Sequence, residues 1–145
     1  MQTQPMHLYR SKLRRVFEVE FKRINKLIKE NCEKESCQSF FIKYSPHLFD
    51  RIIDWEIDVD DIFRLFYKVT DNVHLVHEFL EIPDSESRPL RLEITDGTLW
   101  LGLTLSKRSE IVKHSTQTLQ CRTVIKNPNR LQGRISTHVI KLEQR

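Results

Sequence analysis

The residues best suited to chemistry lie in one short segment, Tyr44 to Arg51. Ser45 is a favourable N-cap and Pro46 a favourable first helical residue, so a helix is predicted to begin here. His47 would then lie in the first turn, where unpaired backbone N–H groups and the helix dipole attract an anion such as phosphate. Arg51 follows one turn later on the same face. An imidazole beside a guanidinium suits attack on an RNA phosphodiester, because the dipole and the cation both favour a neutral His47 that can act as base.

The same segment also has a simpler interpretation. Helical phasing turns Leu48, Ile52 and Trp55 towards a core, with Phe49 beside them. The opposite, polar face of the helix then carries His47, Asp50, Arg51 and Asp54. Such a face is usually only solvated, so spacing alone leaves both interpretations open.

The elements around this segment are predicted to be helices first and strands afterwards. A long amphipathic helix from about Leu8 to Asn31 is indicated by apolar residues at three- and four-residue steps: Leu13, Phe17, Phe21, Ile24 and Ile28. Further helices are predicted over about 47–56 and 58–70, and strands over 40–44, 73–80, 90–95, 98–105, 119–126 and 134–144. Asp96-Gly97 is a hairpin signal, and polar loops are expected over 83–89, 106–118 and 127–130. This order indicates the α+β class, with N-terminal helices packed on a mostly antiparallel sheet.

Composition is that of an ordinary globular domain. The chain has 145 residues, 39% of them hydrophobic and 30% charged, which fits one domain over residues 1–145. The net charge of +4 is unevenly distributed. Eight basic residues lie between positions 10 and 29 against two acids, and six between positions 120 and 145 against one. Basic flanks favour a polyanionic partner, most simply nucleic acid, although basic helices are often only solvent faces.

Nothing in the sequence predicts a membrane segment or a secretory signal, so a cytoplasmic protein is expected. Cys32, Cys37 and Cys121 are odd in number and lack the usual spacing of zinc ligands, so free thiols are expected. His74 and His77 lie three apart in a predicted strand, where they would face opposite sides and form a poor metal site. Neither a metal nor any cofactor is expected.

Other polar and aromatic residues have ordinary explanations. Asp96 is explained by the turn, and Glu93 by an exposed strand position. Trp55 and Trp100 are most simply core residues, although an exposed tryptophan beside Arg91 or Arg122 could stack on an RNA base.

Six runs of the sequence resemble one known family. They are Lys12-Leu-Arg-Arg15, Lys43-Tyr-Ser45 with His47-Leu48 and Asp50-Arg51, Glu56-Ile-Asp58, the run from Arg91 to Gly97, Leu99-Trp-Leu-Gly102 and Leu119-Gln-Cys-Arg122. These runs are similar to the RegB endoribonucleases of T-even-type bacteriophages, and the similarity spans nearly the whole chain. It implies a small, metal-independent ribonuclease with a fold related to the RelE and YoeB mRNA-cleaving toxins.

The resemblance also implies a substrate and partners. Such an enzyme would cut early phage messages at GGAG-type sequences in translation initiation regions, leaving 2′,3′-cyclic phosphate and 5′-hydroxyl ends. It would be stimulated by the largest protein of the host's small ribosomal subunit. We expect it to act on mRNA as a monomer in the host cytoplasm, away from membranes.

Site residues transfer from the family only in part. His47 stands where the family has its first catalytic histidine, and Arg51 matches an arginine linked to activity. Tyr67 occupies the place of the second catalytic histidine. A tyrosine, with a reference pKa of about 10, would be a poor base but could donate a proton or bind a phosphate oxygen. The candidate RNA-binding residues are Arg14, Arg15, Lys43, Lys68, Arg91 and Arg122.

The expected reaction is attack of the ribose 2′-OH on phosphorus, with His47 as base and Arg51 balancing charge. Tyr67 or Lys68 would assist the leaving 5′-oxygen, and the roles of acid and base could be exchanged. Two alternatives stay open: a non-catalytic RNA-binding translational regulator, and a ribosome-dependent toxin of the RelE kind.

Overall fold

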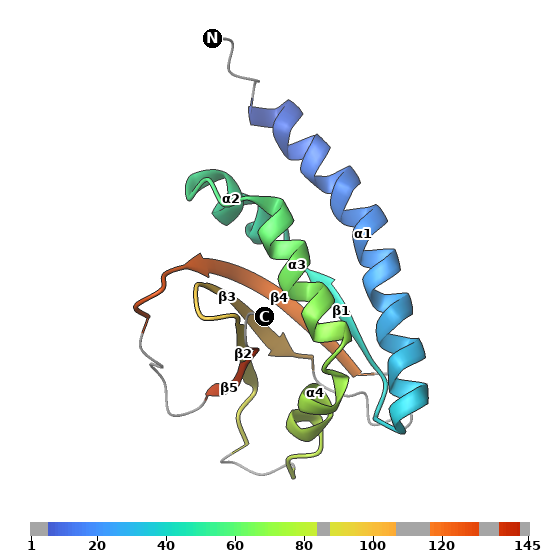
Figure 1. Cartoon of the computed structure of the whole chain (residues 1–145). Coiled ribbons are helices and arrows are strands. Elements are labelled where there is room, and N and C mark those ends of the chain that lie inside the picture. Colours follow the sequence, from blue (N-terminus) through green and yellow to red (C-terminus); the bar gives the residue numbers. More distant parts are fainter. Residues whose placement is uncertain (1–5, 84–87, 107–116, 131–136, 143–145) are drawn as a thin grey trace.

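The computed structural model describes residues 6–83, 88–106, 117–130 and 137–142, with side chains from Tyr9 onwards. In this part of the chain four helices and five strands follow one another (Figure 1). Their order is α1 (Met6–Glu35), β1 (Phe40–Tyr44), α2 (Pro46–Asp54), α3 (Val59–Thr70), α4 (Val73–Leu80), β2 (Arg91–Thr95), β3 (Leu99–Leu105), β4 (Gln117–Lys126) and β5 (Thr137–Lys141). The predicted α+β class is confirmed. None of the described helices is both long and apolar enough to cross a bilayer.

The five strands form one mixed sheet in the order β1-β4-β3-β2-β5. The central strand β3 is antiparallel to both of its neighbours, β4 and β2, whereas β1 runs parallel to β4 and β5 parallel to β2. The predicted antiparallel arrangement therefore holds for the centre of the sheet and not for its two outer strands. The predicted hairpin turn between β2 and β3 is present: Gly97 has φ +104°, and the carboxylate of Asp96 accepts hydrogen bonds from the amides of Thr98 and Leu99.

Helix α1 runs beside β1 and α3 along the whole molecule (Figure 1). Its five predicted core residues are all buried, together with Cys32 one turn after Ile28. Helices α3 and α4 add Ile62, Phe66 and Val76 to the same core. Leu101 and Leu119 on the strands belong to the same cluster, which therefore lies between the helices and one face of the sheet.

Residues 73–80 form the helix α4 rather than the predicted strand. Val73, Val76, Phe79 and Leu80 are its buried residues, a helical spacing. The run is short, apolar and rich in valine, so its composition favoured a strand although its burial follows a helix. His74 and His77 consequently lie on one side of a helix, not on opposite faces of a sheet. Each meets its own partner: Nδ1 of His74 lies 3.8 Å from Glu35, and Nδ1 of His77 accepts a hydrogen bond from the Gln38 amide at 2.8 Å.

The prediction that Trp55 belongs to the core is also wrong. Helix α2 ends at Asp54, with Trp55 as its C-cap, and the chain turns at Glu56, whose φ is +48°. Trp55 is 64% exposed as a result. Leu48, Phe49 and Ile52 are buried as predicted, so the phasing of the helix was correct and only its last turn was not.

Candidate functional site

The junction of β1 and α2 places His47 through fixed backbone contacts. Ser45 is the N-cap of α2, and its hydroxyl accepts a hydrogen bond from the His47 amide at 3.2 Å. The amide of Ser45 donates in turn to the carbonyl of Cys121 on β4 at 2.9 Å. The helix start predicted from Ser45 and Pro46 is confirmed, and Ser45 ties it to the sheet.

The first amides of α2 are not free for an anion, contrary to the expectation from sequence. Pro46 has no N–H, and the His47 amide is bonded to Ser45. The Leu48 amide donates to the carbonyl of Ser45 at 3.0 Å. An anion at this point would therefore be held by side chains and the helix dipole rather than by these amides.

The imidazole of His47 is 83% exposed and has a carboxylate beside it. Its Nδ1 lies 3.7 Å from Oδ2 of Asp50. Arg10 of α1 forms an ion pair with Asp50, donates to the carbonyl of Pro46 at 3.2 Å and lies over the ring of Phe49. The hydrogen bond from Arg10 is the main reason that the pKa of Asp50 lies below its ordinary value. A proton on Nδ1 would face this carboxylate and leave Nε2 as the basic nitrogen towards solvent.

Arg51 of α2 lines a cavity on the sheet face opposite the apolar core. The cavity has a volume of about 280 Å³. Its lining residues are Arg51, Arg91, Glu93, Thr123, Ile125, Arg130 and Thr137. The structure thus brings together Arg51 and Arg91, two residues predicted to bind phosphate and RNA. Three guanidinium groups against one carboxylate give the cavity a positive charge that suits an anion.

Glu93 is buried, so the prediction that it occupies an exposed strand position is wrong. Its side chain is only 8% exposed and forms a 2.8 Å ion pair with Arg130. The Arg130 guanidinium covers the ring of Trp100, at 5.2 Å from its centroid. Trp100 is buried as predicted, and its indole N–H donates to the carbonyl of Asn127 at 3.2 Å. Sequence alternation could have placed Glu93 on this face, but Arg130 lies in a predicted loop and gave no such signal.

Three predicted RNA-binding residues share the same sheet face. Register aligns Lys43 of β1 with Gln120 of β4, Gln120 with Thr104 of β3, and Thr104 with Arg91 of β2. Pairing shifts by one residue between Gly102 and Leu103 of β3, so β4 bulges at Arg122. The Arg122 guanidinium donates to the hydroxyl of Thr104 at 2.8 Å. Lys43, Arg122 and Arg91 therefore form a cationic row, which crosses the sheet to the cavity that contains Arg51.

Tyr67 lies in a different cluster. Its hydroxyl donates to Glu20 of α1 at 2.5 Å, and the Arg23 guanidinium lies 5.6 Å from its ring centroid. Burial, followed by the hydrogen bond to Glu20, raises the pKa of Tyr67 to about 12. Arg10, which reaches Asp50 beside His47, and Glu20 are ten residues apart on α1, about 15 Å along its axis. The structure does not bring Tyr67 and His47 together in one cluster.

The remaining predicted residues are less closely connected. Arg14 and Arg15 are exposed on α1, and Lys68 is half-buried on α3. Burial raises the pKa of Tyr44, and the nearby charge of Arg14 opposes this, so Arg14 lies close to the strand that leads into α2. Among the described residues, no ion pair or side-chain hydrogen bond links Arg15 or Lys68 to His47.

Several residues of the two clusters were not found from sequence. Arg10 and Asp50 are separated by forty positions, and Glu20 and Tyr67 by forty-seven. No local spacing could have paired them.

All three cysteines are free thiols, as predicted. The described ranges contain no group of three or more histidine, cysteine, aspartate or glutamate side chains arranged to hold a metal.

Comparison with known proteins gives a consistent result. A family model described as the phage T4 endoribonuclease RegB matches residues 2–141. The endoribonuclease RegB of Enterobacteria phage T4 is 47% identical over 145 residues, covering 92% of this chain and 94% of that protein. The solution structure of the phage T4 endoribonuclease RegB matches with a TM-score of 0.66 and 46% identity, over 94% of this chain and 95% of the other.

Proposed function

The chain belongs to the RegB family of endoribonucleases, and we propose that it cleaves early phage messenger RNA at GGAG-type sequences in translation initiation regions. Membership in the family makes the protein an endoribonuclease that acts on RNA. The observation that best supports a catalytic site at α2 is the placement of His47. Its exposed imidazole has a carboxylate on one side, and Arg51 one turn later lines a cavity of guanidinium groups.

In the proposed reaction the nucleophile belongs to the RNA. Nε2 of His47 takes the proton of the ribose 2′-OH, whose oxygen forms a bond to phosphorus while the bond to the 5′-oxygen breaks. Arg51 and Arg91 balance the charge that grows on the phosphate. The products are a 2′,3′-cyclic phosphate and a 5′-hydroxyl, and no metal is required because no water has to be activated.

For Tyr67 we propose contact with the RNA beside the scissile phosphate. Its hydroxyl donates its one proton to Glu20, and its pKa is raised to about 12, so the group stays protonated and would donate to the RNA by exchanging Glu20 for an RNA oxygen. Its partner Glu20 lies ten residues further along α1 than Arg10, which pairs with the carboxylate beside His47. We therefore expect water rather than Tyr67 or Lys68 to protonate the leaving oxygen.

Cleavage of a short GGAG-containing RNA tests this function. The parent should cut it in excess EDTA and spare the same RNA with one 2′-deoxy nucleotide at the cut site. A scrambled sequence should be cut far more slowly, and the products should carry cyclic phosphate ends. Binding without cutting would instead indicate a translational regulator, and cutting only on translating ribosomes would indicate a toxin of the RelE kind. Loss of activity in EDTA that a divalent ion restores would contradict the metal-independent scheme.

We further propose that the protein acts as a monomer in the host cytoplasm during infection, stimulated by the largest protein of the host's small ribosomal subunit. Membership of the family supports this proposal. Adding the purified ribosomal protein should raise the cleavage rate of the parent. Sedimentation at working concentration should give the mass of one chain, 17.4 kDa.

A further inference from the structure

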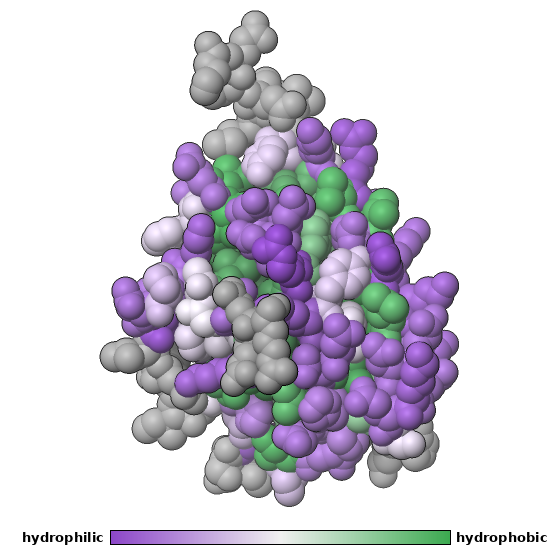
Figure 2. Space-filling model, in the orientation of Figure 1, coloured by the Kyte–Doolittle hydropathy of each residue, from purple (hydrophilic) through white to green (hydrophobic). Residues whose placement is uncertain are grey.

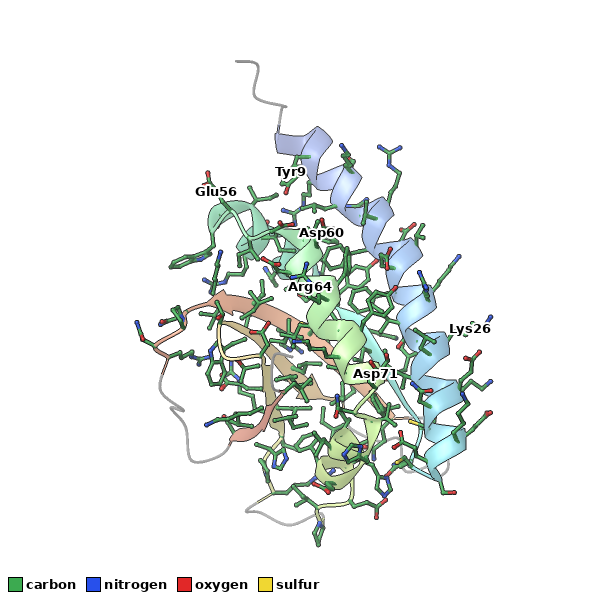
Figure 3. The ribbon with its side chains drawn as sticks, viewed as in Figure 1. Tyr9, Lys26, Glu56, Asp60, Arg64 and Asp71 are labelled. Atoms are coloured by element: carbon green, nitrogen blue, oxygen red, sulfur yellow. The ribbon has the colours of Figure 1, made fainter. Side chains whose placement is uncertain are left out.

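A second hollow lies between α1 and the outer edge of β1. It has a volume of about 950 Å³. One wall is a stripe of α1 from Glu18 to Lys29, and the other is the strand from Phe40 to Tyr44. The eleven residue steps from Glu18 to Lys29 along the helix and the four steps from Phe40 to Tyr44 along the strand each span about 15 Å. We call this hollow the α1–β1 groove. Figure 3 shows Lys26, which lines it, on the side of α1 away from α3.

The charge of the α1–β1 groove suits a polyanion. Four exposed lysines line it against one carboxylate, that of Glu18, and these are Lys22, Lys26, Lys29 and Lys43. Hydrophilic side chains cover much of the α1 side of the molecule in Figure 2. Phe41 also lines the groove and is 41% exposed, an uncommon position for a phenylalanine. Lysines that follow a groove, together with an exposed aromatic ring, are typical of sites for single-stranded nucleic acid.

A peptide strand is a poorer fit to the same groove. The side-chain amide of Asn25 donates to the Ile42 carbonyl at 3.0 Å, and its oxygen accepts from the Ile42 amide at 2.8 Å. The centre of the β1 edge is therefore already paired, as though another strand were present. A protein that added a strand here would have to displace Asn25. Nucleic acid needs only the lysines and the aromatic ring.

We propose that the α1–β1 groove binds about four nucleotides of single-stranded RNA next to the cleavage site, at the stacked spacing of about 3.4 Å each. The inference rests on the proposed function, because it places the flank of the same substrate. The wall of the groove ends at Tyr44, three residues before His47, and Lys43 belongs both to the groove and to the cationic row on the sheet. RNA leaving the reactive phosphate can thus enter the groove directly. Lys26 and Lys29 contact its phosphates, and Phe41 stacks on a base.

The test compares two double variants of equal charge. Lys26→Gln with Lys29→Gln removes two groove cations, and Lys34→Gln with Lys141→Gln removes two exposed cations that do not line the groove. Binding is measured by fluorescence anisotropy with RNA carrying 2′-deoxy nucleotides at the cut site, at lengths of about 6 and about 16 nucleotides. The groove variant should bind the long RNA about 25-fold more weakly at 0.1 M salt, and its log–log salt slope should fall by about 1.4, or 0.7 for each lost contact.

Further measurements separate this inference from the proposed function. Phe41→Leu should weaken binding of the long RNA at least about fivefold, because it removes the stacking ring and keeps an apolar side chain. The short RNA should be bound by every variant as by the parent, and the same short RNA with all its 2′-hydroxyls should be cut by every variant at the parent rate. Equal affinity and salt slope for the groove and control variants on the long RNA would overturn the inference. Failure of the parent to cut any RNA would overturn the proposed function instead, since the binding measurement does not depend on cleavage.

Discussion

Replacing His47 by alanine should remove catalysis and leave the fold almost unchanged. The imidazole is 83% exposed, and the cap of α2 uses the backbone N–H of His47, which alanine keeps. A substitution at so exposed a position should change the free energy of unfolding by less than about 0.5 kcal/mol. Loss of a general base lowers a rate by about 10² to 10⁴, equivalent to about 3 to 5 kcal/mol of activation free energy. The effect on the reaction should thus far exceed the effect on stability.

The assay is single-turnover cleavage of a GGAG-containing RNA at saturating protein, with urea unfolding of the same samples. His74→Ala is the matched control, because His74 is also an exposed histidine near a carboxylate, Glu35, but lies on α4. The control should cut at the parent rate. If the His47 variant is folded and still cuts at more than about half the parent rate, far above the range for a lost base, His47 is not the base.

Three further outcomes are expected. The raised pKa of Tyr67 stabilises the folded state below the unfolded pKa of about 10, and this contribution is lost as pH rises towards about 12. The melting temperature of the parent should therefore fall more steeply than that of Tyr67→Phe between about pH 9 and 12, and parallel curves would contradict this. Gly102→Ala should cost about 1–3 kcal/mol in urea unfolding, since its Cβ would lie 2.6 Å from Cγ2 of Thr123, and adding Thr123→Ser should recover most of the loss. Arg10→Gln should lower the saturating cleavage rate by up to about 100-fold with little change in half-saturation, by releasing the carboxylate beside His47, and Arg10→Lys should lose less.

Local signals in the sequence predicted the elements that hold the site. Ser45 followed by Pro46 fixed the start of α2, because capping depends on neighbouring residues only. The apolar stripe of α1 was equally clear from its spacing. The same spacing argument failed at residues 73–80, because a short apolar run fits either a strand or a helix. In the structure these residues form a helix that packs against α1 and β5. It also failed at Trp55, where the helix ended one residue before the predicted core position.

The chemistry of the site depended on contacts that no local pattern reports. No pattern in the sequence relates Lys43, Arg91 and Arg122 to one another, and it is the strand register with the bulge in β4 that places them in one row. Glu93 was misread because an alternating strand with one exposed face is the simplest assumption, whereas Arg130 and Trp100 cover it. The resemblance assigns Tyr67 to the place of the second catalytic histidine, and no local pattern in the sequence predicts its contact with Glu20 of α1.

The parallel pairing of β1 with β4 also determines when the site can form during synthesis. Phe40 pairs with Gln117, and the amide of Ser45, which begins the helix carrying His47, bonds to Cys121. These partners are made more than seventy residues later. A growing chain on the ribosome holds His47 long before it holds the strand that fixes the start of α2. Ser45 therefore cannot make this bond until β4 has emerged, so a catalytic site that needs His47 in this position would form only after most of the chain has been made.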